Sequence, residues 1–407
     1  MSLSSSSLVP RAVVATCLWL ILSYAVAMAW VPDLWAELAA QGAVFAVTIV
    51  AALAWFVRGT WPARSWLLVP VALVPAWGLL QLALRTTVNR YRTEIAVLIT
   101  ASVACAFLLG LYAFHDRRVS YIFRVLAIVL GTALAALAIV QLFTSDGLVY
   151  WSIRSPYSSQ PMGPFLNRDN YSTFIELVLP LALWEAVRNS RSAWLYGIPC
   201  AIMYGSVIAG ASRAGSILVS LEVLAVLVPA LISRRRASYG ATPRALAAIT
   251  LIVIFSILVG WDVLLGRFDD KDPYGNRREY VESSAQMVAD RPVLGSGLGT
   301  WSIVYPRYAI VDMRAASFHA HNDWMEWACD GGLPVLCFML ICAMRGSWLS
   351  LRYPWGFGML AASLHALVDF PFRIWPTILC FFLVLAAMEA RDSAEREDTH
   401  VTTPPGV

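Results

Sequence analysis

The run EIAVLITASVACAFLLGLYAF, residues 94–114, carries one charged side chain, Glu94, and that residue lies at its start. A helix needs about 20 apolar residues to cross a bilayer, so this run is long enough to span one. The whole chain has the same character. Hydrophobic residues make up 59% of its 407 residues and charged residues 14%, whereas a soluble chain carries roughly a quarter charged residues. The sequence therefore predicts an integral membrane protein, with no room for a separate soluble catalytic domain.

Runs of this kind recur along the chain and predict an all-α polytopic fold of about 12 transmembrane helices in one integral membrane domain, 1–407. They lie at about 12–31, 36–57, 65–84, 94–114, 121–143, 171–188, 194–211, 214–232, 245–265, 332–345, 355–370 and 374–391. The first contains Ala25-Val26-Ala27, which is like a signal-peptidase site, but its length favours an uncleaved anchor. The polar stretch 392–407 is expected to be a disordered cytoplasmic tail.

Arginines predict the orientation, because short cytoplasmic loops carry an excess of Lys and Arg. Arginine pairs and clusters occupy every second loop, which places these loops and both termini in the cytoplasm. The polar stretches 144–170 and 266–331 then lie on the outer face. Arg85, Arg90 and Arg92 also fall on the outer side, against the rule. Either a span is misplaced there, or an anionic ligand needs these arginines.

The larger outer stretch, 266–331, is expected to be a loop outside the membrane, periplasmic if the protein is bacterial, that carries active-site residues. Its segment 276–290 is typical of a helix, and four of its positions could rest on the membrane surface: Tyr280, Ser284, Met287 and Val288. The glycines of GSGLGT, residues 295–300, predict tight turns. A nucleotide-binding loop is a poor explanation for them, because no βαβ pattern surrounds the motif. The basic residues of the stretch are Arg267, Lys271, Arg277, Arg278, Arg291, Arg307 and Arg314.

The stretch SFHAHNDWMEWACDGGLP, Ser317–Pro334, joins this loop to the next apolar run. His321 is the first candidate for chemistry, because a histidine can be neutral at ambient pH and accept a proton. A hydrogen-bonded helix cap is the alternative. The neighbours Asn322 and Asp323 and the basic loop favour an acid/base centre that faces an anionic ligand. A zinc site is a further alternative, although no CxxC or Cys/His spacing indicates a metal and we expect none. Its ligands would be His319, His321, Asp323 and Glu326.

Charged residues in or beside apolar runs are costly, so each needs a partner or a function. Arg213, in GASRAGS, has small neighbours that leave room for a bulky headgroup, and the alternative is an arginine that snorkels at a helix end. Arg168, in NRDN, lies at the outer start of the sixth span, where Asp169 or Asn170 is expected to cap the helix. Glu176 lies about two turns further along that helix. It is expected to pair with an arginine or to stay protonated.

The outer turn between the last two predicted spans holds Asp369 and Arg373, in HALVDFPFRIW. These residues are four positions apart across Pro371. A mutual ion pair that fixes the turn is one interpretation, and a supporting role for Asp369 near the active centre is the other.

The segment NRDNYSTFIELVLPLAL is followed by GASRAG, by R-x-x-Y before DRPVLGSGLGTW, by HAHNDWMEWACDGGLP and by HALVDFPFRIW. In this order the motifs resemble those of the O-antigen ligase family of bacterial membrane glycosyltransferases. His321, Asn322, nine further residues and Gly332 match the family's HN-x9-G signature. The resemblance covers roughly Pro161–Ala387.

This resemblance implies a GT-C-like membrane enzyme that transfers a glycan from undecaprenyl diphosphate on the periplasmic face, without a metal or another cofactor. It implies that Arg213 and an outer-loop arginine, best matched by Arg278 beside Arg277, hold the diphosphate. It also implies that His321 is the general base and that Asp369 is a further important residue. Asn322 is expected to orient the base, and Arg168 to join the diphosphate-binding arginines.

The chemistry of these residue types agrees with the resemblance. Guanidinium groups neutralise a departing diphosphate without a proton transfer, and one positioned base can deprotonate the attacking hydroxyl. Such an in-line displacement inverts the anomeric carbon.

Several acceptors fit the same residues. Ligation onto lipid A core is our first expectation and polymerisation onto a growing lipid-linked glycan the second, while the short outer loop argues against a protein acceptor. A transporter or flippase for the lipid-linked glycan is the alternative from another class, with His321 as a proton relay. The partners expected are the lipid-linked donor, the acceptor and membrane lipids, and no nucleic acid.

Overall fold

The computed structural model describes residues 5–154, 160–188, 193–232, 277–311 and 317–402, with Gly275 and a few positions between 247 and 255. Within these ranges the regular structure is helical, apart from one isolated bridge and one short hairpin. In the hairpin, β1 (Leu148–Val149) pairs antiparallel with β2 (Ile153–Arg154). The described part of the chain therefore has the all-α fold that its composition predicts.

The helices of the first half follow the apolar runs of the sequence. They are α1 (Ser5–Ala27), α2 (Leu34–Arg58), α3 (Leu68–Ala83), α4 (Arg90–Phe114), α5 (Arg117–Thr144), α6 (Arg168–Arg188), α7 (Ala193–Ala209) and α8 (Arg213–Ile232). Each overlaps one of the first eight predicted spans, because apolar length is a local property of the sequence. The ninth predicted span, 245–265, lies outside the described residues apart from isolated positions.

The second half contains longer and shorter helices in alternation. They are α11 (Arg277–Asp290), α12 (Trp301–Val304), α13 (Asp323–Arg352), α14 (Gly358–His365) and α15 (Trp375–Thr402), with the 3₁₀ turns η2 (Tyr305–Arg307), η3 (Pro354–Gly356) and η4 (Pro371–Arg373). Five described helices are long and apolar enough to cross a membrane: α1, α2, α4, α5 and α13. The shorter helices α3 and α7 are also apolar. These features fit a polytopic membrane protein.

The last three predicted spans differ from the helices that form. α13 begins nine residues before the predicted 332–345, because its early acidic residues are buried in ion pairs and behave as part of the core. α14 replaces the predicted span 355–370 with eight residues. At about 1.5 Å per residue it is too short to cross a bilayer alone.

The tail predicted to be disordered is helical as far as Thr402. Arg345 and Arg352 of α13 pair with Asp392, and Arg352 also pairs with Glu395 at 3.0 Å. Within α15, Arg396 bonds Asp392 at 2.7 Å. These pairs let the helix continue beyond its apolar part. Residues 403–407 lie outside the described ranges.

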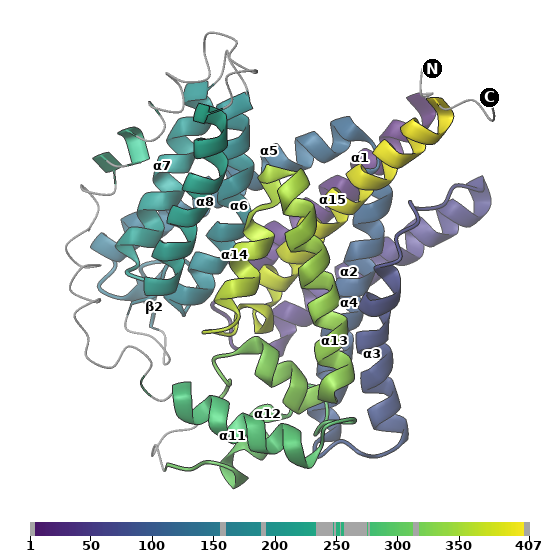
Figure 1. Ribbon diagram of the computed structural model, residues 1–407, viewed down its shortest axis with the longest axis vertical. Coiled ribbons are helices and arrows are strands. Elements are labelled where there is room, and N and C mark those ends of the chain that lie inside the picture. Colours follow the sequence, from purple (N-terminus) through teal and green to yellow (C-terminus); the bar gives the residue numbers. More distant parts are fainter. Residues whose placement is uncertain are drawn as a thin grey trace.

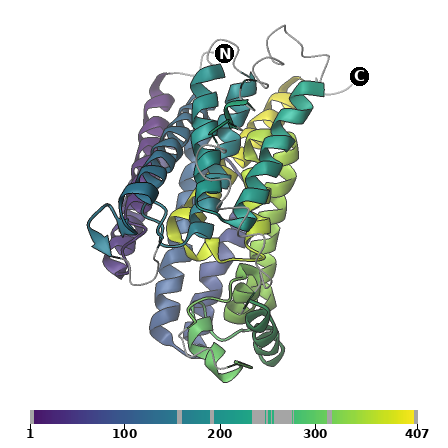
Figure 2. The same cartoon turned by 90° about the vertical axis from the view of Figure 1, so that its left-hand side faces the viewer.

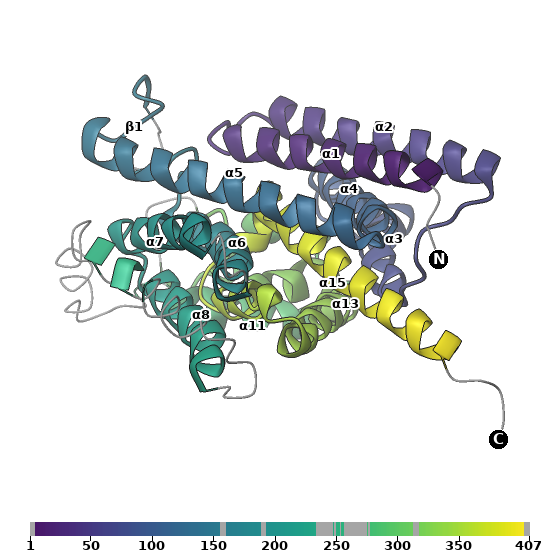
Figure 3. The same cartoon turned by 90° about the horizontal axis from the view of Figure 1, so that it is seen from above.

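The helices form one bundle with both termini at the same end (Figures 1 and 2). We call the opposite end, which carries α11 and α12, the loop end. Seen from above, α5 runs between α1 and the group formed by α6, α7 and α8 (Figure 3). α6 is central, since its residues from Asn170 to Leu183 are all buried. The first turn of α6 begins at Arg168 at the loop end. Because the residues that follow are buried, this turn has a fixed place in the fold.

At the loop end, α11, α12 and η2 pack on α13 around a small apolar cluster of their own. Met287, Trp301, Tyr305, Ala320 and Cys329 are its buried members. Ser284 is also buried and accepts a hydrogen bond from Trp301 Nε1 at 2.9 Å. The expectation that Ser284 and Met287 rest on the membrane surface was therefore wrong, because this face of α11 is covered by the loop's own aromatic residues.

The GSGLGT motif joins the loop to the bundle. Gln81, buried at the end of α3, donates to the carbonyls of Leu294 (2.5 Å) and Asp330 (2.9 Å) and accepts from the Leu298 N–H (3.0 Å). Just before the motif, residues 292–293 pass so close to α13 that a Cβ on Gly332 (φ +70°) would collide with the carbonyl of Val293. The glycine that ends the HN-x9-G signature is therefore required by close backbone packing.

Candidate active site

His321 forms a hydrogen-bonded pair with Asp369. The Nδ1 atom of His321 lies 2.8 Å from Oδ1 of Asp369, and the Asp369 side chain is fully buried while 30% of the His321 side chain is exposed. A carboxylate at Nδ1 favours the tautomer with the proton on that nitrogen, which leaves Nε2 as the proton acceptor. The second Asp369 oxygen accepts from Asn167 Nδ2 at 3.4 Å. This arrangement suits a general base.

Aromatic rings hold the imidazole from two directions. Tyr280, in the first turn of α11, stacks on His321 with ring centroids 5.9 Å apart and planes 12° apart. Phe370 meets the His321 ring edge to face at 4.8 Å. His321 also has a left-handed backbone (φ 49°), which is uncommon for residues other than glycine. The surroundings thus fix both the backbone and the ring of this residue.

Asn322 is the N-cap of α13. Its Oδ1 accepts from the Met325 N–H at 3.1 Å, and its Nδ2 donates to the Leu367 carbonyl at 3.0 Å. Both polar groups of the Asn322 side chain therefore form hydrogen bonds with backbone groups. This geometry supports a positioning role for Asn322 and gives it no contact with the His321 ring.

A second group of contacts centres on Asp169, in the first turn of α6. Its Oδ1 accepts from Ser212 Oγ at 2.6 Å, and its Oδ2 pairs with an Arg277 nitrogen at 3.3 Å. Ser212 directly precedes Arg213, the first residue of α8. The starts of α6, α8 and α11 therefore meet at Asp169. Because helix N-termini favour anions, this meeting point suits a phosphate ligand.

The four arginines predicted to bind a diphosphate all lie at these helix starts. Arg168 begins α6, Arg213 begins α8, and Arg277 and Arg278 begin α11. Arg277 is the one in contact with Asp169, whereas the neighbouring Arg278 is exposed. The structure thus brings three predicted segments together through Asp169.

The tripeptide Asn167-Arg168-Asp169 links the two groups. Asn167 contacts Asp369 of the histidine pair, and Asp169 contacts Arg277. Consecutive Cα atoms are 3.8 Å apart, so the backbone positions of Asn167 and Asp169 are less than about 8 Å apart. Asn167 Oδ1 also accepts from the Asp169 N–H at 2.7 Å. The sequence assigned the cap of this helix to Asp169 or Asn170, whereas Asn167 accepts the bond that caps it. The contact of Asn167 with Asp369 was missed because nothing local indicates a partner 202 residues away.

Arg373 does not pair with Asp369, contrary to one interpretation of the sequence. It pairs with Asp323 at 3.4 Å, Glu326 at 3.2 Å and Asp330 at 2.9 Å. Arg373 is the last residue of the 3₁₀ turn η4, and Asp369 faces His321 while Arg373 faces α13. Burial acts to lower the pKa of Arg373, but the three carboxylates raise it above its ordinary value. Arg373 therefore stays charged and neutralises the acidic start of α13.

The alternative zinc site is not formed by the residues that the sequence suggested. His319 Nδ1 lies 3.2 Å from Glu326, and its ring stacks on Phe370 at 4.2 Å, while His321 has Asp369 as its partner. No group of three or more His, Cys, Asp or Glu side chains in the described ranges is arranged to hold a metal ion.

The buried Glu176 also has a partner other than the one expected. It pairs with His365 of α14 at 2.7 Å, and both side chains are fully buried. This pair lies in the interior of the bundle, where α14 packs against α6.

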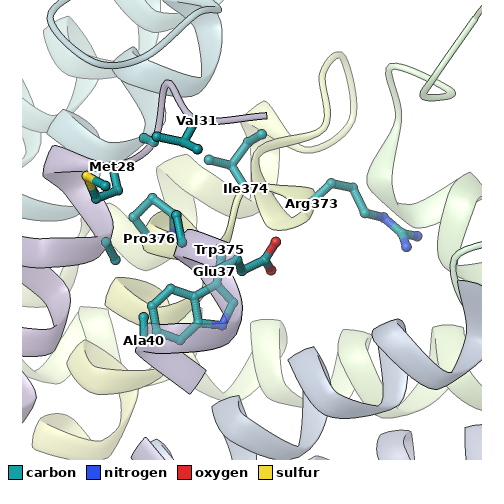
Figure 4. Close-up of a pocket in the computed structure, with 11 residues that line it drawn as sticks. Met28, Val31, Glu37, Ala40, Arg373, Ile374, Trp375 and Pro376 are labelled. Atoms are coloured by element: carbon teal, nitrogen blue, oxygen red, sulfur yellow. The ribbon is translucent and has the colours of Figure 1, made fainter. Parts of the chain in front are cut away.

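A cavity of about 160 Å³ lies near the turn after η4, between the first turns of α2 and residues 373–376. Figure 4 shows that the Arg373 side chain extends away from the other lining residues. Its guanidinium lies among the α13 carboxylates. Glu37, Trp375 and Pro376 are among the other residues that line the cavity.

Residues 198–340 match the family model described as O-antigen ligase. The resemblance to the O-antigen ligase family is thereby confirmed. The matched range contains Arg213 at the start of α8, the helix α11, and the signature residues His321 and Gly332. No curated protein matches the chain. The family and the apolar helices together indicate a membrane glycosyltransferase of the ligase or polymerase type, which acts on a lipid-linked glycan and an acceptor.

Proposed function

We propose that this protein transfers a glycan from undecaprenyl diphosphate to a hydroxyl of lipid A core on the periplasmic face of the inner membrane. The observation that carries the proposal is the Asn167–Asp169 tripeptide, which joins the His321–Asp369 pair to Arg277 and the start of α8. A base and an anion-binding region thus lie side by side, as a transfer from a lipid diphosphate requires.

His321 is the general base of the proposed reaction. As the acceptor oxygen forms its bond to the anomeric carbon, its proton passes to Nε2 of His321, and the bond from that carbon to the diphosphate oxygen breaks. Asp369 stabilises the imidazolium that results, as carboxylates beside catalytic histidines do. Because the attack is a single displacement, the anomeric carbon inverts and no sugar is bound covalently to the protein.

Arg213, Arg277, Arg278 and Arg168 hold the departing diphosphate. The charge that develops on it is matched by guanidinium groups and by the N-terminal ends of three helices. Asp169 contacts Arg277 and so restrains its orientation. This route assigns no step to a metal ion or to another cofactor.

The test uses purified protein with a lipid-linked repeat unit, with and without lipid A core. The proposal predicts a product on lipid A core and no chain growth in its absence. Growth of the lipid-linked glycan without lipid A core would contradict the ligase assignment and favour the polymerase reaction at the same site. Movement of donor across a membrane with no product under either condition would favour a flippase.

A further inference from the structure

A cavity lined by two arginines lies at the loop end, apart from the histidine pair. Its volume is about 480 Å³, and it is lined by Arg85 and Thr86 on one side and by residues 291–295 on the other. Arg85 and Arg291 are both exposed, so their guanidinium groups are accessible. Arg85 is one of the three arginines that break the charge rule for outer loops.

This cavity is well separated from the proposed diphosphate site. Arg277 begins α11 and contacts Asp169, while Arg291 follows the last residue of the same helix. They are fourteen positions apart, which corresponds to about 21 Å at 1.5 Å per residue. A leaving group must touch the reacting carbon near His321, which stacks on the first turn of α11. The cavity at Arg291 therefore needs a different occupant.

Hydrogen bonds to Gln81 hold the backbone on both sides of the cavity. Arg85 has a left-handed conformation (φ 56°), which is disfavoured for a residue with a side chain. The following N–H, of Thr86, donates to the Gln81 carbonyl at 3.1 Å. The Gln81 side chain bonds the Leu294 carbonyl on the opposite wall at 2.5 Å. One buried residue thus ties both walls together.

The surroundings of the cavity are amphipathic. Leu84, Val293 and Leu333 are large apolar residues that are about half exposed or more, at 54%, 60% and 47%. Leu84 directly follows the apolar helix α3, and the Leu333 N–H donates to the Pro292 carbonyl at 2.8 Å. Two arginines beside exposed apolar side chains at helix ends match a phosphate group carried on a lipid.

We propose that this cavity binds a phosphate of the acceptor glycolipid, and this inference rests on the proposed ligase function. The lipid A part of the acceptor carries its phosphates at the membrane surface, whereas the accepting hydroxyl lies on a distant core sugar. A phosphate site about 21 Å along α11 from Arg277 suits such a molecule. Paired guanidinium groups are well matched to phosphate oxygens.

The test measures binding of lipid A core to the full-length protein in phosphatidylcholine nanodiscs, with no donor present. The native glycolipid is compared with the same glycolipid after enzymatic removal of its phosphates. The wild type should bind the phosphorylated form at least about tenfold more tightly, as expected for two charge-assisted contacts. The Arg85→Gln/Arg291→Gln double variant should bind both forms equally.

Arg90→Gln is the matched control, because Arg90 is also an outer arginine but pairs with Glu94 at 2.7 Å and does not line the cavity. It should keep the wild-type preference. If the double variant does not fold, each single variant should show a smaller loss of the same preference.

A double variant that still prefers the phosphorylated form would overturn the inference, as would a wild type without any preference. Displacement of the glycolipid by an equal concentration of phosphatidylglycerol would also overturn it, since the cavity would then accept any anionic lipid. Because this test measures binding and not transfer, its result can be interpreted even if the proposed catalytic function is wrong.

Discussion

The imidazole of His321 and the carboxylate of Asp369 lie 2.8 Å apart although 48 positions separate them in the chain. α13 begins two residues after His321, and Asp369 lies in the turn between α14 and α15. The Asp323 N–H donates to the Ala366 carbonyl at 2.9 Å, which fixes the two segments next to each other. The proposed base is therefore placed by the packing of three helix ends.

Asp369→Asn is expected to lower the rate of glycan transfer by a factor on the order of 10³, because an amide cannot stabilise the imidazolium and can select the wrong tautomer. The measurement is the rate of product formation at saturating donor, with the melting temperature as a check on folding. Asp398→Asn, an exposed change in α15, serves as the control and should leave the rate unchanged. A fully active Asp369→Asn enzyme would show that the pair with His321 has no part in catalysis.

Arg213→Lys is expected to lose most of the transfer activity, by about 100-fold, since lysine keeps the charge but not the bidentate geometry that suits a diphosphate. Transfer should be measured together with donor affinity, because both should fall. Full activity in the lysine variant would return Arg213 to the role of a snorkelling arginine at a helix end.

Arg373→Met is expected to destabilise the protein by about 3–5 kcal/mol, because it leaves buried carboxylates without a counter-charge. Asp323, Glu326 and Asp330 all lose their partner at once. Thermal unfolding in detergent measures the effect, with the exposed Arg307→Met as the control. An unchanged melting temperature would mean that these acids do not depend on Arg373.

Gly332→Ala is expected to lower the melting temperature and the activity together. The left-handed φ of +70° costs roughly 1–2 kcal/mol for a residue with a Cβ, and the new methyl group would collide with the Val293 carbonyl. Gly42→Ala in α2 is the matched control, since a Cβ there meets nothing within 4 Å. Equal stability of the two variants would argue against the close packing described at Gly332.

The parts of the fold that were predicted from the sequence are those that depend on local apolar length. α4 and α5 nearly coincide with the runs 94–114 and 121–143. The start of α13 was missed because Asp323 and Asp330 read as polar, and the arginine that neutralises Asp330 lies 43 positions away. Burial of a charge depends on a distant partner, and hydropathy does not carry that information.

The candidate site divides in the same way. His321 and Arg213 stand out because each is a charged or titratable residue in an unusual local setting. Tyr280 was considered only as a residue that could rest on the membrane surface. Its stacking on His321 is a contact between segments 41 positions apart, which no spacing rule indicates. The sequence also offered Arg373 as one possible partner of Asp369, since they are close in the chain, and could not show that the turn η4 directs Arg373 toward α13.

The central claim is that His321 is the base of the transfer reaction and does not hold the donor. Product formation and binding of the lipid-linked donor should be measured in parallel for His321→Ala and for the wild type. The account predicts that donor affinity changes by less than about threefold while product formation is lost. Product formation at the wild-type rate in His321→Ala would contradict it.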